Sequence, residues 1–189
     1  MLKLVRPAFV ILVLLTLVTG VAYPLAVTGI AQVLMPQQAN GSVIRRGDAV
    51  IGSDLIGQNF TSPRYFWSRP SATSPDPYNA SASSGSNLGT TSAKLRDRVA
   101  GDVERLKSTG ITGSIPADAV TTSGSGLDPH ISPEFALAQV DRIAAARQLP
   151  VEQVRALLDK TIEGAAFGIV GQPRVNVLEL NLALDALKS

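Results

Sequence analysis

The stretch PAFVILVLLTLVTGVAYPLAVTGIAQVLM, from Pro7 to Met35, contains no charged residue. A helix needs about 20 apolar residues to cross the hydrocarbon core of a bilayer, so this longer run predicts one membrane-spanning helix over residues 7–35, with its core at about residues 8–30. The apolar part of a signal peptide is shorter, and residues 29–31 make a weak cleavage site. We therefore expect a retained helix that anchors the chain to a membrane.

The charges on either side of this stretch indicate its orientation. Lys3 and Arg6 precede it and favour a cytoplasmic N-terminus over residues 1–6. Two arginines follow a short distance beyond the other end, so the difference in charge is modest. We expect residues 36–189 to form a domain outside the cytoplasm.

The span also carries residues that bear on its shape and packing. Tyr23 and Pro24 mark a kink or an interfacial bend, because proline cannot donate a hydrogen bond within the helix. We expect both membrane lipid and a partner helix to contact the span. Small side chains would let that partner approach closely, and they are Thr16, Gly20, Ala22 and Ala26.

The composition of the chain excludes several classes of function. Its 189 residues leave room for one ordinary domain beside the span. The net charge of +2 and the lack of a basic run argue against nucleic-acid binding. The absence of cysteine excludes disulfides, thiol catalysis and cysteine-ligated zinc. One histidine and scattered carboxylates give no ligand spacing, so we expect no metal site.

The residues after the span predict a small α+β domain over 36–189. Strands are expected at 49–56 and at 119–122. The region 61–92 is rich in Pro, Ser, Gly and Asn, yet it contains four aromatic residues. Disordered segments are poor in aromatic residues, so we expect this region to be an ordered loop.

Three helices are expected to follow this loop. They begin near Ser92, at Ser132 and at Pro150, where apolar residues recur at helical spacing after a capping residue or a first-turn proline. The tail at 175–187 alternates like a strand but also fits a helix. We favour the helix, because Asn176 stands where it would cap one.

The stretch SGSGLDPHIS, from Ser123 to Ser132, contains the only histidine, His130. A hydrolase could pair His130 with Asp128 or a nearby serine, but no G-x-S-x-G motif is present. A phosphate loop could use the glycines, but the G-x-x-x-x-G-K-[ST] pattern is missing. The glycines and the Asp128-Pro129 pair favour a structural turn before a capped helix.

Five blocks follow the membrane span in order, and they are GSDLIGQNF (52–60), YFWSRPSA (65–72), PYNASASSGSNLG (77–89), SGSGLDPHIS (123–132) and GQPRVNVLELNLALD (171–185). With the span, they make the chain resemble the KdpC family, the small C subunits of bacterial Kdp potassium-transporting ATPases. The resemblance covers essentially the whole chain. It departs from the family pattern at Ser84, at Thr90 and at 161–163, where the family usually has Gly, Pro and His-Thr-Glu.

The resemblance implies a place in a complex of the bacterial cytoplasmic (inner) membrane. In this family a channel-like subunit carries potassium, a P-type ATPase subunit hydrolyses ATP, and a very small fourth subunit is typical. The C subunit is implied to be non-catalytic, with ATP and magnesium bound only by the partner ATPase subunit. It is implied to act in assembly and regulation, as a catalytic chaperone that raises the ATP affinity of the ATPase subunit.

The implied role and the expected topology have to be reconciled. ATP is absent outside the cytoplasm, where the charges place the domain. We therefore expect the domain to lie over the external entrance of the channel subunit and to affect ATP affinity through the complex. Two alternatives stay open: a membrane-anchored extracytoplasmic hydrolase that uses His130, and a binding module that uses the loop at 65–89.

The dense blocks supply the candidate site residues. No catalytic residue is expected. The side chains in these blocks either contact a partner or hold the loop in shape through hydrogen bonds to the backbone. The candidates are Tyr65, Arg69, Ser71, Asn79, Ser86, Asn87, Gly89, Gly126, Asp128 and His130.

Overall fold

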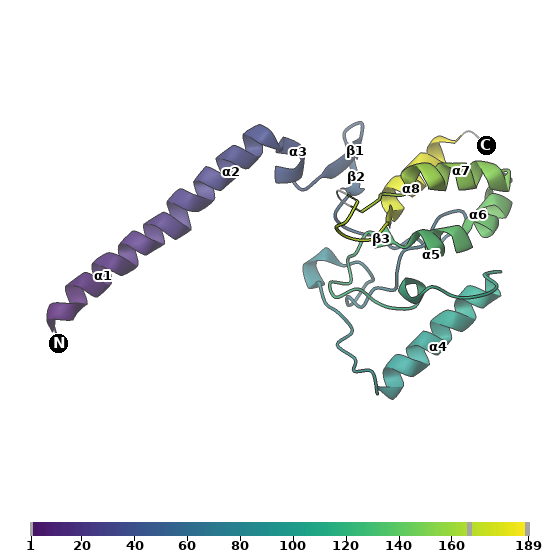
Figure 1. Ribbon diagram of the computed structural model, residues 1–189, viewed down its shortest axis with the longest axis horizontal. Helices are drawn as coiled ribbons and strands as arrows, with labels where there is room; N and C mark the ends of the chain where they lie inside the picture. The colour runs from purple at the N-terminus through teal and green to yellow at the C-terminus, as the bar shows by residue number, and fades with distance from the viewer. Residues whose placement is uncertain (1, 166–167, 188–189) are drawn as a thin grey trace. The chain divides into compact units, whose positions relative to one another are not determined.

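Figure 1 shows the computed structural model of the chain, which describes residues 2–165 and 168–187. The chain divides into two compact units, Met1–Ile51 and Gly52–Ser189. The first unit contains a long apolar helix and most of a β-hairpin. The second contains five α-helices and a short two-stranded sheet among the described residues, so the described fold mixes helix and strand.

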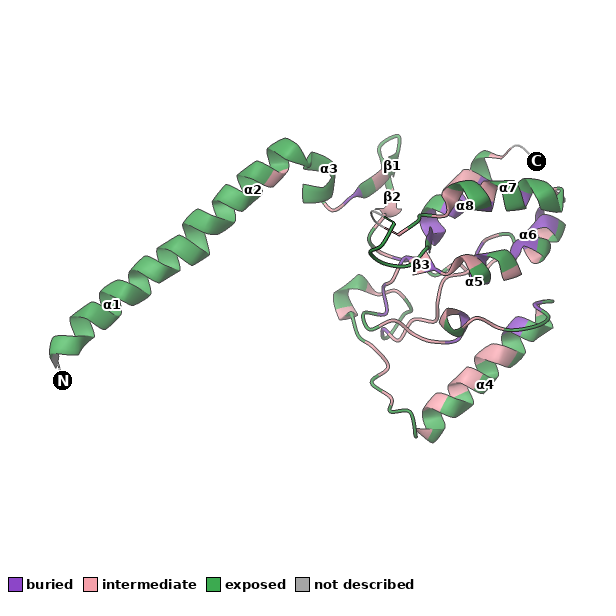
Figure 2. Ribbon diagram, viewed as in Figure 1, coloured by how far each residue is buried: buried purple, intermediate pink, exposed green. Residues whose placement is uncertain are grey.

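The long apolar helix is continuous through three segments: α1 (Leu2–Leu17), a π-helical turn η1 (Val18–Ala22) and α2 (Tyr23–Leu34). Its stretch Lys3–Leu34 is long and apolar enough to cross a membrane, and none of it is buried. Figure 2 shows this helix exposed along nearly its whole length. The structure thus contains the apolar helix that the sequence predicts.

Pro24 explains the π-helical turn. Proline has no N–H to donate to the carbonyl of Gly20, four residues earlier. The N–H of Tyr23 donates instead to the carbonyl of Val18, five residues back, which is the π-helical pattern. The irregularity predicted at Tyr23 and Pro24 therefore lies within the turn just before them.

A short connector leads from the long helix to the hairpin. The connector contains the short helix α3 (Pro36–Ala39). The hairpin consists of strand β1 (Val43–Arg46) paired with strand β2 (Ala49–Ser53). Gly47 occupies the first turn position with φ of 61°, a value that favours glycine. The strand predicted at 49–56 ends early, because the carbonyl of Ser53 accepts the N–H of Ile56 in a tight turn.

The helices of the second unit are α4 (Ala93–Ser108), α5 (Pro133–Ala138), α6 (Val140–Arg147), α7 (Val151–Thr161) and α8 (Val177–Ala186). The antiparallel sheet joins β3 (His130–Ile131) to β4 (Val175–Asn176), and two 3₁₀ turns are η2 (Ala80–Ala82) and η3 (Ala117–Ala119). Figure 2 shows buried residues on α6 and α8. Phe66 from the long loop and Leu106 from α4 join this core.

Four of the predicted helical features are confirmed. Ser92 caps α4 by accepting the N–H of Leu95, and α7 begins directly after Pro150. Ser132 caps α5 by accepting the N–H of Phe135. Asn176 caps α8, so the tail is the helix that we favoured over a strand.

Two predictions about secondary structure are wrong. Residues 119–122 do not form a strand, because Ala119 ends the turn η3 and arginine side chains bind the next three carbonyls. Arg98 donates to Val120, and Arg69 donates to Thr121 and Thr122. The helix predicted from Ser132 is interrupted at Gln139, which separates α5 from α6. The sequence analysis also missed strand β3 within the stretch that it interpreted as a turn.

Candidate functional site

Two buried amide side chains hold the long loop against the helices. The N–H of Phe66 donates to Oδ1 of Asn181 at 2.8 Å, and Nδ2 of Asn181 donates back to the Phe66 carbonyl at 3.0 Å. Gln139 makes the same pair of bonds with Trp67. The N–H of Trp67 donates to Oε1 of Gln139 at 2.7 Å, and Nε2 of Gln139 donates back to the Trp67 carbonyl at 3.3 Å. Both amide side chains therefore replace the neighbouring strand that this extended segment lacks.

Two arginines on α6 fix the part of the loop just before this segment. Arg142 donates to the carbonyls of Pro63 and Tyr65, and its guanidinium lies 3.9 Å from the centre of the Trp67 ring. Burial lowers the pKa of Arg142 to about 10, so it stays charged at neutral pH. Arg147 donates to Asp185 at 2.7 Å, and the Tyr65 hydroxyl donates to the same carboxylate at 3.0 Å.

Ser71 links two parts of the loop to the turn before β3. Its Oγ donates to the carbonyl of Gly126 at 2.7 Å and accepts the N–H of Tyr78 at 3.0 Å. Gly126 has φ of +69°, and a Cβ there would lie 2.8 Å from the carbonyl oxygen of Ser84. This close approach of two backbone segments requires glycine. Burial raises the pKa of Tyr78 to about 12, and its hydroxyl donates to the carbonyl of Arg69.

Arg69, Asp128 and His130 form the charged centre of the candidate residues. Arg69 Nη1 lies 2.8 Å from Oδ2 of Asp128, and Nδ1 of His130 lies 3.5 Å from Oδ1. Burial opposes ionisation of Asp128, but hydrogen bonds from His130 and the charge of Arg69 outweigh it and lower the pKa of this carboxyl. Asp128 is therefore a fixed anion that orients the turn before β3.

The structure brings some of the ten candidate residues together and separates others. Arg69, Ser71, Gly126, Asp128 and His130 form one hydrogen-bonded group, which the preceding contacts define. Tyr65 lies apart from this group, beside α8 through its contact with Asp185.

The other candidates belong to the later part of the loop. Asn79 is tied to the group through Thr73, whose Oγ1 accepts the Asn79 N–H, and it caps η2. Ser86 lines a cavity beside the group. Asn87 has a positive φ of 51°, and the carbonyl of Gly89 accepts the N–H of Ser92 just before α4.

Two cavities flank Arg69. One, of about 700 Å³, is lined by Arg69, Asp118, His130, Glu134 and Arg174 among others. The second, of about 500 Å³, is lined mainly by loop residues, including Phe60, Trp67, Tyr78 and Ser86, together with Arg98 and Arg105 of α4. The loop blocks thus form walls of both cavities.

The geometry around the histidine offers little for nucleophilic catalysis. The hydroxyls of Ser123 and Ser125 accept backbone N–H groups of the same turn. Ser132 Oγ donates to Asp118 at 2.9 Å and caps α5. Over residues 2–165 and 168–187, no three His, Asp or Glu side chains form a group that could hold a metal ion.

The sequence analysis missed the residues that hold the loop to the helices: Gln139, Asn181, Arg142 and Arg147. A signal was present for the two amides. Asn181 interrupts the run LELNLAL and Gln139 follows FALA, so each is a polar residue within an apolar stretch. A buried polar side chain needs a hydrogen-bonding partner, and the loop backbone supplies one.

The small residues of the long helix form two pairs, Thr16 with Gly20 and Ala22 with Ala26, each four residues apart. A Cβ on Gly20 would lie 3.9 Å from Cγ2 of Thr16, so the first pair shares a face. All four residues are exposed. The π-helical turn η1 contains Gly20 and Ala22.

Comparison with known proteins places the chain in a family. The family of K⁺-transporting ATPase c chains, KdpC, matches residues 5–186. A potassium-transporting ATPase KdpC subunit of Allorhizobium ampelinum is 57% identical over 186 residues, covering 98% of this chain and 97% of its own length.

Further relatives agree with that match. A KdpC subunit of Rhodopseudomonas palustris is 57% identical over 197 residues, covering 98% of each chain. One of Methylobacterium nodulans is 56% identical over 198 residues, covering 99% of this chain and 98% of its own length. The chain described here therefore belongs to the KdpC family, the c chains of K⁺-transporting ATPases.

Proposed function

We propose that this chain is a non-catalytic assembly and regulatory subunit of an ATP-driven potassium uptake complex. Its partners are a channel-like potassium subunit, a P-type ATPase subunit and a very small fourth subunit. The chain raises the ATP affinity of the ATPase subunit, which itself binds ATP and magnesium. The observation that carries the proposal is the set of hydrogen bonds that fix the loop. Arg69 donates to Asp128 and to the Thr121 carbonyl, and Ser71 donates to the Gly126 carbonyl.

A fixed loop suits recognition of a partner. Docking onto a preformed surface avoids the entropy cost of ordering that surface during binding. Charges around the long helix favour a cytoplasmic N-terminus over residues 1–6, the span over 7–35 and residues 36–189 outside. In this arrangement the domain lies over the external entrance of the channel subunit, and its effect on ATP passes through the complex.

One observation favours a binding module as the second candidate. The cavity of about 500 Å³ is lined by Phe60, Trp67 and Tyr78 and also by Arg98 and Arg105. Aromatic walls with a few polar groups are typical of sites for small ligands. A binding module would hold a soluble ligand there without any membrane partner.

Co-purification tests the proposal. The tagged chain is expressed with the potassium-transporting ATPase subunits, extracted in mild detergent, and assayed for potassium-stimulated ATP hydrolysis. We expect two large membrane partners, and a higher KM for ATP in complexes prepared without the chain. A chain that purifies alone from cells expressing these partners contradicts the proposal.

Two variants separate the candidates. Arg69→Ala should weaken assembly or potassium-stimulated hydrolysis, whereas Arg155→Ala, at an exposed position of α7, should do neither. Under the subunit proposal His130→Ala should also weaken assembly or potassium-stimulated hydrolysis, because His130 belongs to the same hydrogen-bonded group as Arg69. Turnover by the isolated chain that His130→Ala abolishes would instead support the hydrolase.

A further inference from the structure

The hairpin is fastened to the last turns of the long helix. The side-chain amides of Gln32 and Asn40 donate to one another at 3.3 Å and 3.1 Å, and Asn40 also donates to the carbonyl of Pro36. The N–H of Ser42 donates to the carbonyl of Gln37 at 2.9 Å. β1 therefore begins at a position set by the end of α2, within the same compact unit.

The length of the helix fixes where that position lies in a membrane. The stretch Lys3–Leu34 has 32 residues, which at 1.5 Å per residue is about 48 Å. A bilayer is about 40–45 Å thick including its headgroups, so a helix of this length with a modest tilt ends in a headgroup layer. Each strand of the hairpin reaches at most about 13–17 Å from its base, so the hairpin stays close to that layer.

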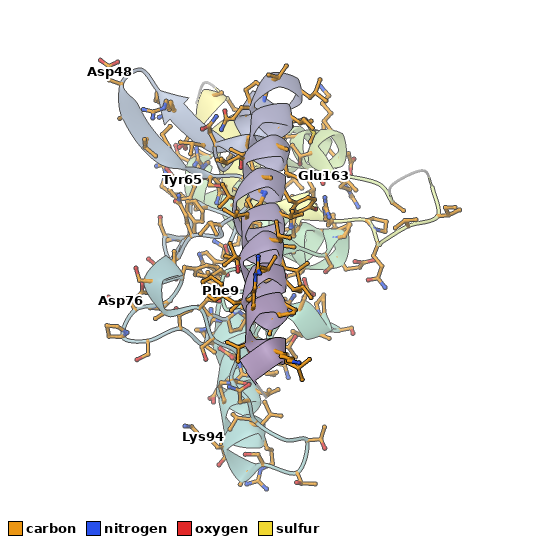
Figure 3. All side chains as sticks on the ribbon, turned by 90° about the vertical axis from the view of Figure 1, so that its left-hand side faces the viewer. Phe9, Asp48, Tyr65, Asp76, Lys94 and Glu163 are labelled. Atoms are coloured by element: carbon orange, nitrogen blue, oxygen red, sulfur yellow. The ribbon has the colours of Figure 1, made fainter. Side chains whose placement is uncertain are left out.

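The side chains of the hairpin fit such a position. Val43 and Val50 are 38% and 58% exposed, and Arg45 and Arg46 are exposed as well. A two-stranded hairpin is marginally stable in water and needs a surface against which to pack. Asp48 lies at the hairpin tip (Figure 3), so the two arginines leave the exposed hairpin with an excess of positive charge.

We propose that the β1–β2 hairpin lies in the headgroup layer and binds anionic phospholipids. The guanidinium groups of Arg45 and Arg46 pair with lipid phosphates, while Val43 and Val50 contact the upper part of the acyl chains. Arginine suits this place because its fork of donors matches phosphate and its stem tolerates an apolar surface. The inference goes beyond the proposed function, and it holds for either orientation of the chain.

The absence of cysteine makes a site-specific probe straightforward. The full chain with Val50→Cys is labelled with an environment-sensitive fluorophore and reconstituted into phosphatidylcholine vesicles with and without phosphatidylglycerol. Quenching by brominated lipid and by aqueous iodide is measured for the same sample. Phe9→Cys, in the middle of α1 and 65% exposed, serves as the reference for a lipid-facing position.

We expect lipid quenching at position 50 that rises at least twofold with phosphatidylglycerol, while iodide quenching falls. The double variant Arg45→Gln/Arg46→Gln should remove the effect of phosphatidylglycerol, and quenching at position 9 should not change. Iodide quenching that is equally strong in both vesicles overturns the proposal. Shielding that appears only when the transporter partners are present also overturns it, because the hairpin would then face protein.

Discussion

Asn181→Leu tests whether the buried amides hold the long loop in place. Leucine has a similar size, but it can neither accept the N–H of Phe66 nor donate to its carbonyl. Phe66 is fully buried and Asn181 is 2% exposed, so water cannot replace the lost partner without opening the core. The substitution therefore leaves one donor and one acceptor unsatisfied inside the protein.

The size of the effect follows from these two groups. Each buried polar group left without a partner costs about 1–3 kcal/mol, so the pair predicts a loss of about 2–6 kcal/mol. The greater hydrophobicity of leucine offsets about 1 kcal/mol of this loss. Because domains of this size are stable by about 5–15 kcal/mol, the variant should unfold at much lower denaturant concentration.

The only tryptophan, Trp67, is next to Phe66 and reports on the loop directly. Denaturant unfolding of the full chain in mild detergent, followed by tryptophan fluorescence, gives the free energy of unfolding. Hydrogen exchange of the Phe66 and Trp67 amides should accelerate in parallel. Gln153→Leu, at an exposed position of α7, is the matched control. A loss below about 1 kcal/mol, with unchanged exchange at Phe66, would refute the reasoning.

Three further predictions follow from the loop and its surroundings. Gly126→Ala should destabilise the domain by about 1–3 kcal/mol in the same assay, because Gly126 has a φ of +69° and an added Cβ would crowd the carbonyl oxygen of Ser84. The control Gly89→Ala should be nearly neutral, because a Cβ there meets nothing within 4 Å. The pKa of Asp128 is lowered in the folded chain, so its ionised form stabilises the fold above the unfolded-state pKa, and this stabilisation is lost as pH falls through the folded-state pKa. Asp128→Asn should therefore flatten the acid side of the profile of unfolding free energy against pH, measured by denaturation. Burial and the charges of Asp54 and Glu163 raise the pKa of Glu179, so its ionisation costs stability as pH rises from 4.5 through the folded value. Glu179→Gln should therefore be at least as stable as the parent at pH 7, and this advantage should vanish at pH 3, where the carboxyl is protonated in both states.

The helices and the long apolar span could be predicted from sequence because their signals are local. Ser92, Ser132 and Asn176 each cap the helix that follows them, and capping depends only on the next three residues. The apolar run before Met35 needs no knowledge of distant contacts either. The structure therefore confirms the apolar helix and the helix starts after Ser92, Ser132 and Asn176.

The remaining features depend on partners far along the chain. Among the described residues no strand lies beside 119–122. The N–H groups of Ala119 and Val120 bond within η3, and Arg69 and Arg98, at least 22 positions away, bind the carbonyls of residues 120–122. The strand at His130 exists only because Val175 and Asn176 return to pair with it. Sequence periodicity contains no information about which distant segment will supply a partner.

The candidate residues Arg69 and Ser71 stabilise the loop, and this affects how a role in partner binding can be assigned to them. Arg69 and Ser71 were chosen from the sequence, and both tie the loop to a later segment of the chain. Arg69 donates to the carbonyls of Thr121 and Thr122, and Ser71 donates to the carbonyl of Gly126. A variant at either position should therefore loosen the loop, and a loose loop weakens docking of a partner even where no contact is lost, because the loop must be ordered again on binding. Loss of assembly at Arg69 or Ser71 consequently identifies a contact only when the free energy of unfolding is unchanged. Ser86 lines the cavity of about 500 Å³ in a part of the loop where the described contacts show no such buried clamp, so its variants separate recognition from stability more cleanly.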